Sequence, residues 1–279
     1  MRLATMLLAT LLPFAASPAF AQSLQQMAGQ MIVVGFAGTS ADAKGVAALR
    51  AEVAAGDIGG VMYLKTNVAS REAVEAMNAA FREAAPAGLP PFITLDQEGG
   101  LVERLDKSVG FKEIPDAASV AAKNTPAEAR GIYDGQAQGV ADWGFNVNFA
   151  PVVDLSINPN NQVIAKYGRA FGKNGEVVAK YAAEVIAAHH AAGVLTSLKH
   201  FPGHGSSTAD SHEGYVDITK TWQDSELEPY RELIAGGYED MVMIGHLIDT
   251  NVDPSGMPSS LSKPWIEGVL RDKLGFKGV

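Results

Sequence analysis

The sequence contains no cysteine among its 279 residues. This absence excludes disulfide bonds, thiolate metal sites, cysteine nucleophiles and a lipid anchor on an N-terminal cysteine. An excess of positive charge is also missing, because 31 acidic and 22 basic residues give a net charge of −9. Nucleic acids and anionic membranes attract basic surfaces, so neither is expected as a partner. No GxGxxG or P-loop pattern occurs, and we expect no cofactor.

The apolar run near the N-terminus, Leu3 to Phe14, is too short to span a bilayer. It follows the positive charge of Arg2 and precedes the small-residue sequence Ala19-Phe20-Ala21. This order is typical of a secretory signal peptide with its cleavage site. We therefore expect residues 1–21 to be removed and the mature protein to be exported to the periplasm or the medium, without a membrane anchor.

Apolar runs typical of buried strands alternate with helical runs through the rest of the chain. The strand-like runs are residues 31–36, 58–64, 91–95, 145–153, 194–198 and 241–245. The helix-like runs are residues 41–55, 71–85, 126–143, 176–192, 226–235 and 263–274. Continuous apolar strands separated by helices predict a parallel sheet with both faces covered.

Polar side chains follow several of these strands, namely Asp96, Asp154, Lys199-His200 and His246. Chemistry at the C-terminal ends of the strands is typical of a (β/α)₈ barrel; an open doubly wound sheet is the alternative. A barrel has eight strands, and we find six and the start of a seventh at residues 276–279. We expect residues 22–279 to form the catalytic barrel domain, truncated after about six βα units.

The stretch from Lys199 to Gly214 concentrates the chemistry-bearing residues. Pro202 and the neighbouring glycines predict a loop after a strand. In that loop Asp210 stands two residues before His212, so the carboxylate and the imidazole can meet and form an acid/base pair. Local capping and solvation are the alternative for such a cluster.

For the other candidate site residues, residue type alone does not distinguish a functional role from a structural one. Asp96 and Arg104 could together hold vicinal hydroxyls of a ligand, or they could form an ion pair at the surface. An isolated arginine such as Arg169 is more typical of a surface position. His246 ends a strand, and whether it faces the site stays open. We expect packing or surface roles for His189 and His190 in a helix, and a structural role for His204 between two glycines.

A metal site built from His200, His204, Asp210 and His212 is the remaining chemical alternative. Pro202 lies between the first two histidines, so these cannot share one helix face as in zinc proteases. We expect no metal.

The motifs resemble those of glycoside hydrolase family 3, in its bacterial β-N-acetylglucosaminidase branch. The matching segments, in the order of the family, are Asp96-Gln97-Glu98-Gly99-Gly100 with Arg104, Asn148 to Asp154, Arg169-Ala170-Phe171-Gly172, Lys199 to Gly205, and Asp210-Ser211-His212. The Asp-Ser-His element distinguishes this branch from the β-glucosidases of the family.

The resemblance implies a (β/α)₈ barrel that removes terminal β-linked N-acetylglucosamine with retention, from peptidoglycan-derived or chitin-type oligosaccharides. It implies His212 as the acid/base and Asp210 as its partner. The residues that it implies for sugar binding are Asp96, Arg104, Arg169, Lys199 and His200. We expect a carbohydrate substrate and a monomer. Histidine suits the acid/base role because it titrates near neutral pH.

Two departures from the family pattern limit what the resemblance implies. The nucleophile of the family is an aspartate after the seventh strand, and we expect it beyond Val279, so that residues 1–279 alone would be inactive. Leu101 also stands where the family usually has arginine. A phosphorolytic enzyme on the same scaffold and a non-catalytic sugar-binding protein remain alternatives.

Overall fold

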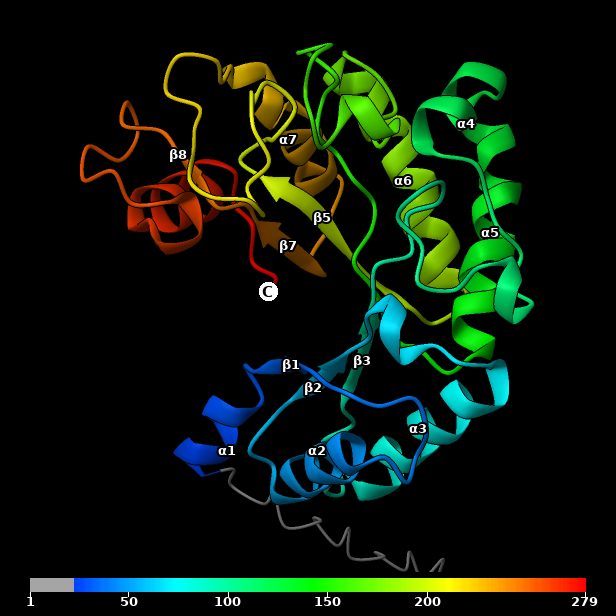
Figure 1. Cartoon of the computed structure of the whole chain (residues 1–279). Helices are drawn as coiled ribbons and strands as arrows, with labels where there is room; N and C mark the ends of the chain where they lie inside the picture. Colours follow the sequence, from blue (N-terminus) through cyan, green and yellow to red (C-terminus); the bar gives the residue numbers. More distant parts are fainter. Residues whose placement is uncertain (1–22) are drawn as a thin grey trace, which may run out of the picture.

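The computed structural model describes residues 23–279 and contains one main parallel sheet (Figure 1). Its strands, in spatial order, are β1 (Val33–Gly35), β2 (Gly60–Met62), β3 (Phe92–Leu95), β4 (Val147–Asn148), β5 (Leu195–Phe201) and β7 (Met241–Ile244). Spatial order follows chain order without the reversal that defines a doubly wound sheet. The barrel-type α/β prediction is therefore confirmed. The expected signal peptide lies outside the described residues.

Helices connect the strands and cover the outer side of the curled sheet (Figure 1). They are α1 (Leu24–Gly29), α2 (Lys44–Ala55), α3 (Arg71–Ala84), α4 (Ala117–Lys123), α5 (Pro126–Asp142), α6 (Gly175–Ala191), α7 (Glu228–Ala235) and a π-helix (Pro264–Lys273). Thr125 caps α5 in a capping box with Glu128, and Asn174 caps α6. Over residues 23–279, no helix has the length and hydropathy needed to cross a bilayer.

The two ends of the main sheet, β1 and β7, are not paired with each other in the described part of the chain. Residues 276–279 do not form the predicted seventh strand, but Val279 begins to pair along β7. Its carbonyl accepts from Val242 N at 2.8 Å, and its own N–H donates to Asp240 O at 2.9 Å. A short second sheet, β6 (Val216–Asp217) with β8 (Leu247–Ile248), lies outside the main one.

Each predicted strand run overlaps an observed strand but differs from it in its bounds, and two of the differences bear on the site. The run 145–153 contains only β4, which ends at Asn148; beyond it Val153 N still donates to Lys199 O at 2.8 Å, so the chain stays beside β5 without forming a regular strand. The strand predicted at 194–198 instead extends to Phe201, with Lys199 opposite Met243 and Phe201 opposite Ile244. Lys199 and His200 are therefore part of β5 rather than of the loop after it.

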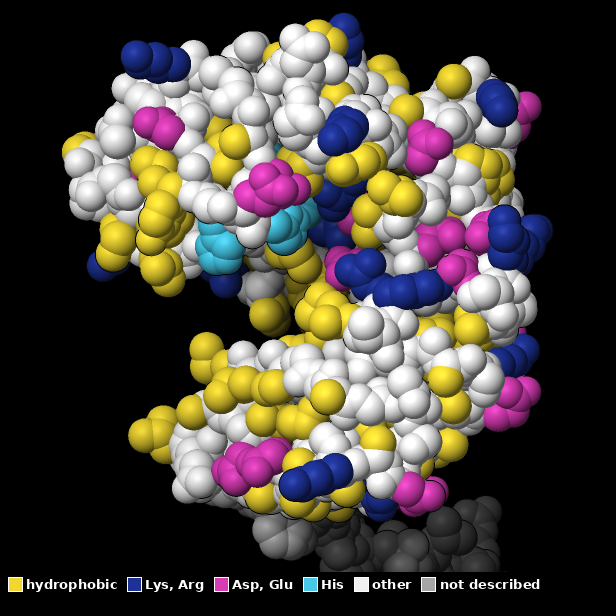
Figure 2. Space-filling model, viewed as in Figure 1, with side chains coloured by type: hydrophobic (Ala, Val, Ile, Leu, Met, Phe, Trp, Pro, Cys, Tyr) yellow, Lys and Arg dark blue, Asp and Glu magenta, His cyan; other side chains and the backbone are white. Residues whose placement is uncertain are grey.

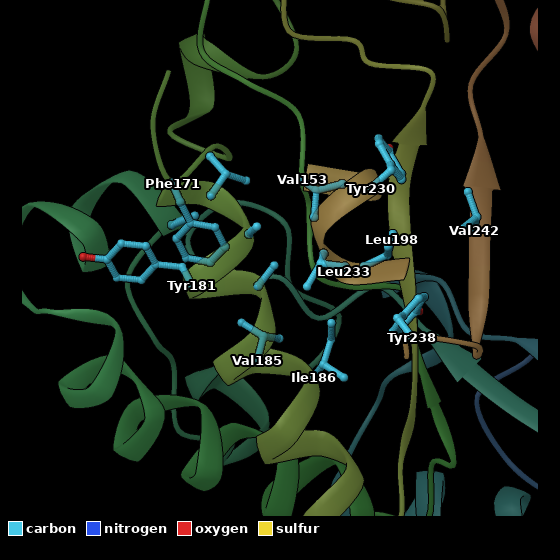
Figure 3. Close-up of a cluster of buried hydrophobic side chains, with 14 of the residues drawn as sticks. Val153, Phe171, Tyr181, Val185, Ile186, Leu198, Tyr230, Leu233, Tyr238 and Val242 are labelled. Atoms are coloured by element: carbon cyan, nitrogen blue, oxygen red, sulfur yellow. The ribbon is translucent and has the colours of Figure 1, made fainter. Parts of the chain in front are cut away.

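The core lies mainly between the sheet and its helices. Figure 3 shows α6 side chains such as Val185 and Ile186 facing Leu198 of β5 and Leu233 of α7. A second cluster packs α2 and α3 against β2 and β3, with Phe81 and Ile93 fully buried. Burial of these apolar side chains holds the sheet rigidly, so the strand ends are fixed supports for the polar groups above them.

Candidate active site

A buried ammonium group joins two carboxylates at the ends of β3 and β5. Lys199 Nζ lies 2.7 Å from Asp96 Oδ1 and 2.6 Å from Glu98 Oε1, and its side chain is only 2% exposed. The other oxygen of Asp96 accepts from Arg104 Nη2 at 2.8 Å. Such a buried cation is stable only because both carboxylates compensate its charge.

Arg169 completes this network from the long connection between β4 and α6. Its Nε and Nη2 each lie 2.8 Å from an oxygen of Glu98, which makes a bidentate pair, and its Nη1 donates to Val163 O at 3.1 Å. Arg169 is buried, so the surface position expected from its residue type alone was wrong. The carboxylate of Glu98 needs two cationic partners because it lies almost wholly out of solvent.

The charges of the network keep its carboxylates ionised. Burial alone would raise the pKa of Glu98, but the charges of Lys199 and Arg169 outweigh burial and lower the pKa to about 2. Burial opposes ionisation of Asp96 too, and Lys199 and Arg104 bring its pKa below the usual range. Both groups therefore act as permanent anions at any physiological pH.

Asp154 organises the turn after β5. Its Oδ2 lies 2.7 Å from His200 Nδ1, and its Oδ1 accepts the backbone N–H groups of His200 at 3.1 Å and His204 at 2.7 Å. Burial lowers the pKa of His200, so the imidazole is neutral and donates Nδ1–H to the carboxylate. Its Nε2 then faces Arg169 Nη2 at 3.4 Å as an acceptor.

Two glycines allow the segment after β5 to pack this closely. A Cβ at Gly205 would lie 1.6 Å from Leu155 O, and Gly203 has φ +128°, a backbone conformation that side chains disfavour. Glu226 Oε2 accepts the N–H of Gly205 at 3.0 Å from the opposite side. The glycines of the motif are therefore explained by close backbone contact.

The predicted acid/base pair lies on the loop that follows. Asp210 Oδ1 lies 2.6 Å from His212 Nδ1 and accepts the His212 backbone N–H at 2.9 Å. The expectation that these two side chains meet is confirmed. His212 is 74% exposed, and burial of Asp210 is outweighed by hydrogen bonds from His212, which lower the pKa of the carboxyl.

The structure thus brings the seven predicted residues into two groups. Asp96, Arg104, Arg169, Lys199 and His200 share one buried network, whereas Asp210 and His212 form a separate exposed pair. Histidine, basic and acidic side chains gather around the hollow between the upper and lower parts of the molecule (Figure 2).

Sequence reasoning did not assign roles to Glu98 and Asp154. Both lie inside the quoted motifs, and both follow a strand on the same rim as Asp96. Their position after a strand was the signal from which a role in the site could have been predicted. Their partners are far along the chain: Arg169 lies 71 residues after Glu98, and His200 lies 46 residues after Asp154.

Three further histidines, His189, His190 and His246, each have a side-chain partner outside this network. His189 is buried, with Nε2 2.9 Å from Asn148 Nδ2, and burial lowers its pKa to about 4. His190 is exposed and lies 2.6 Å from Asp240. His246 contacts Ser260 Oγ at 2.5 Å. Packing and surface roles for the first two are confirmed. Within residues 23–279, no three His, Asp or Glu side chains are arranged to hold a metal ion.

The profile of the glycosyl hydrolase family 3 N terminal domain matches residues 23–279, which is nearly the whole chain. The chain belongs to glycosyl hydrolase family 3. A β-hexosaminidase of Xylella fastidiosa (strain M23) is 37% identical over 258 residues, which span 89% of this chain and 72% of that protein. The family is one of glycosidases, so this family 3 chain is a member of an enzyme family that cleaves glycosidic bonds.

Solved structures agree with this family 3 assignment. A β-N-acetylglucosaminidase of Paenibacillus sp. str. FPU-7 is 34% identical with a TM-score of 0.83, over 93% of this chain and 48% of that one. The chain thus spans about half the length of the Paenibacillus protein. NagZ of Neisseria gonorrhoeae in complex with N-trifluoroacetyl-D-glucosamine is 26% identical with a TM-score of 0.78, over 89% of this chain and 72% of that one.

Proposed function

We propose that the protein is a retaining glycosidase that removes terminal β-linked N-acetylglucosamine from oligosaccharides. The observation that carries the proposal is the 2.6 Å contact between Asp210 and His212 on the loop after β5. A carboxylate and an imidazole in contact, next to the carboxyl ends of parallel strands, suit general acid/base catalysis.

His212 is the proposed acid/base. Its Nδ1–H donates to Asp210 Oδ1, which leaves Nε2 to protonate the leaving oxygen and later to accept a proton from water. The carboxylate of Asp210 orients the ring and stabilises the imidazolium form. The high exposure of His212 supports this role, because Nε2 must reach a substrate.

The buried network is the proposed floor of the sugar site. Asp96 and Arg104 retain some exposure, so an oxygen and a guanidinium group remain accessible to sugar hydroxyls, whereas Lys199 is almost fully covered. We propose that Arg169 and His200 complete the binding of the sugar. Charged groups held by several partners are already oriented, which favours specific binding over loose contact.

The carboxylates of the network are poor candidates for the nucleophile. Asp96, Glu98 and Asp154 each accept two or more short hydrogen bonds from cations, a histidine or backbone N–H groups. A retaining enzyme needs a second carboxylate beside the anomeric carbon. We therefore propose a nucleophile downstream of Val279.

The substrate class and compartment extend the same proposal. Relatives named β-hexosaminidase and β-N-acetylglucosaminidase support N-acetylglucosamine as the sugar. We propose peptidoglycan-derived or chitin-type oligosaccharides as substrates and export as the route, with Gln22 as the first residue after cleavage. N-terminal sequencing of the protein recovered from outside the cytoplasm tests the export part.

The decisive experiment is hydrolysis of an aryl N-acetyl-β-glucosaminide by the full-length gene product. The expected result is turnover that gives the β-anomer first, and His212→Ala is expected to lower kcat by about 10²–10⁴-fold. His190→Ala is the control, because that exposed histidine lies on α6, where its Nε2 is 2.6 Å from Asp240 Oδ2 rather than in the proposed pair. Turnover at the wild-type rate in His212→Ala would overturn the proposal.

The same assay separates the two rivals. Phosphate dependence with a sugar 1-phosphate as product would assign a phosphorolytic enzyme. Binding of N-acetylglucosamine without any turnover would assign a sugar-binding protein instead.

A further inference from the structure

One buried histidine connects the floor of the site with the exposed loop. The ring of His204 has Nδ1 2.6 Å from Ser207 Oγ and Nε2 3.0 Å from Ser211 Oγ. Ser211 stands between Asp210 and His212, the proposed acid/base pair. The imidazole of His204 therefore contacts both the start of the loop and the residue at the centre of that pair.

The hydrogen-bond partners assign the tautomer of this ring. Ser207 Oγ lies 2.9 Å from the His204 carbonyl and 3.3 Å from the Ala209 carbonyl, both of which can only accept, so we assign its single hydroxyl proton to these carbonyls. Asn161 Nδ2 also donates to Ser207 Oγ, at 3.0 Å. With this assignment Ser207 Oγ accepts from Nδ1–H of His204. In the neutral ring Nε2 has a free lone pair, and the Ser211 hydroxyl donates to it.

The support beneath His204 is rigid. Its backbone N–H donates to buried Asp154 at 2.7 Å, and its carbonyl accepts from Asn161 Nδ2 at 2.9 Å. The next residue, Gly205, is held between Leu155 and the carboxylate of Glu226. His204 itself is 2% exposed. The ring thus has a fixed position from which it can hold a less constrained segment.

The loop from Thr208 to Gly214 has few other attachments. Most of its residues are exposed. Within the described residues, its side-chain hydrogen bonds to the rest of the chain are the contact between Ser211 and His204 and a longer one of 3.3 Å from Ser207 Oγ to a loop carbonyl. The remaining side-chain bonds of the loop are internal, including the pair itself.

We propose that His204 is a positioning residue, which sets the placement of Asp210 and His212 through its hydrogen bond to Ser211. The inference rests on the proposed function, because it gives the pair a catalytic role. The Ser211 hydroxyl donates to Nε2 of a ring whose position is fixed by Asp154 and Ser207. Without this bond the pair would sample a wider range of positions, and fewer of them would place His212 at the scissile oxygen.

The test uses matched substitutions at Ser211 in the full-length protein. Ser211→Ala removes the hydroxyl and Ser211→Thr keeps it. Thr208→Ala is the control on the same loop, because that exposed side chain makes no hydrogen bond within residues 23–279. We expect Ser211→Ala to lower kcat about tenfold with KM changed less than twofold, because binding by the buried network is untouched. Ser211→Thr and Thr208→Ala should stay within twofold of wild type.

A second readout does not depend on activity. Tyr215, directly after the loop, is 86% exposed, so chymotrypsin cleavage there reports how freely the loop moves. Cleavage should be several-fold faster in Ser211→Ala than in wild type, Ser211→Thr or Thr208→Ala. Equal cleavage rates in all four proteins, or an unchanged kcat in Ser211→Ala, would overturn the inference. An equal loss of kcat in Ser211→Thr would also overturn the inference, because that variant keeps the hydroxyl.

The experiments distinguish a wrong acid/base role for His212 from a wrong positioning role for His204. If His212→Ala keeps the wild-type rate, His212 is not the acid/base, and His204 cannot affect catalysis by positioning it. The cleavage rates then still report separately whether the bond between His204 and Ser211 restrains the loop.

Discussion

The network around Lys199 and the pair of Asp210 and His212 contain the same kinds of groups but differ in burial and in the number of partners. Lys199 has two carboxylate partners and almost no exposure, whereas His212 has one partner and is largely exposed. Multiple partners in a low-dielectric setting fix charge and position. A single partner near solvent leaves a group free to move toward a substrate.

This difference separates two tasks of a glycosidase. The low pKa of Glu98 keeps its charge constant, which suits a network that we propose to hold a sugar in one orientation. Acid/base catalysis requires a group that gains and loses a proton in each cycle. The buried network is suited to the first task and the exposed pair to the second.

The largest expected effect comes from removing the central cation. Lys199→Met leaves Asp96 and Glu98 buried with fewer compensating charges, so we expect the free energy of unfolding to fall by about 3–5 kcal/mol. Urea unfolding followed by circular dichroism measures it. Lys180→Met is the control, because Lys180 contacts Glu176 at 2.7 Å on the exposed face of α6, and no measurable change is expected there. Equal losses in both variants would remove the distinction between buried and exposed charges.

Acid should destabilise the folded network once the pH falls below about 4.5. The pKa of Glu98 is about 2 in the folded protein against an ordinary value of 4.5, so the unfolded chain binds more protons between these values. The stabilisation is complete above about pH 4.5 and is lost as the pH falls toward 2. The shift of about 2.5 pH units corresponds to about 3 kcal/mol.

Urea unfolding at a series of pH values from 2.5 to 6 (~0.5 apart) tests this acid sensitivity. Glu98→Gln has no titrating group at this position, so its stability should depend less on pH over the same range. Parallel curves for wild type and Glu98→Gln would contradict the prediction.

A smaller effect is expected from the exposed pair. Asp210→Asn keeps an oxygen that accepts from His212 but loses the charge that stabilises the imidazolium, so we expect kcat of the full-length protein to fall about 10–100-fold. The free energy of unfolding should not change measurably, because the pair lies near solvent. Rates on an aryl N-acetyl-β-glucosaminide and urea curves measure the two quantities. A large loss of stability with an unchanged kcat would reverse the roles of the two regions.

Much of the arrangement was predictable from local pattern. Apolar runs located all six strands of the main sheet, and capping residues such as Thr125 and Asn174 mark the starts of two long helices. Strand bounds were less predictable, since β4 ends at Asn148 although the apolar run continues to Val153, and the pairing of β5 with β7 carried the other strand as far as Phe201. Pairing between strands depends on the neighbour, which a single run of residues does not contain.

The candidate site was predictable as a set of residues but not as a set of contacts. The motifs predicted that Asp96, Lys199 and His212 belong together, and the Asp-x-His spacing allowed the pair to meet. The tertiary structure alone assigned Arg169 to Glu98 and His200 to Asp154. It also decided that Lys199 is buried while His212 is exposed.

The sequence by itself determined the order of strands and helices, the polar residues at the strand ends and the glycine-rich loop, because these depend on local periodicity and backbone preference. Tertiary structure decided which charges neutralise one another and which remain exposed. The physical reason is distance along the chain. Lys199 and Asp96 are 103 residues apart, and only the parallel sheet, in which β4 alone separates β3 from β5, brings Lys199 Nζ within 2.7 Å of Asp96 Oδ1.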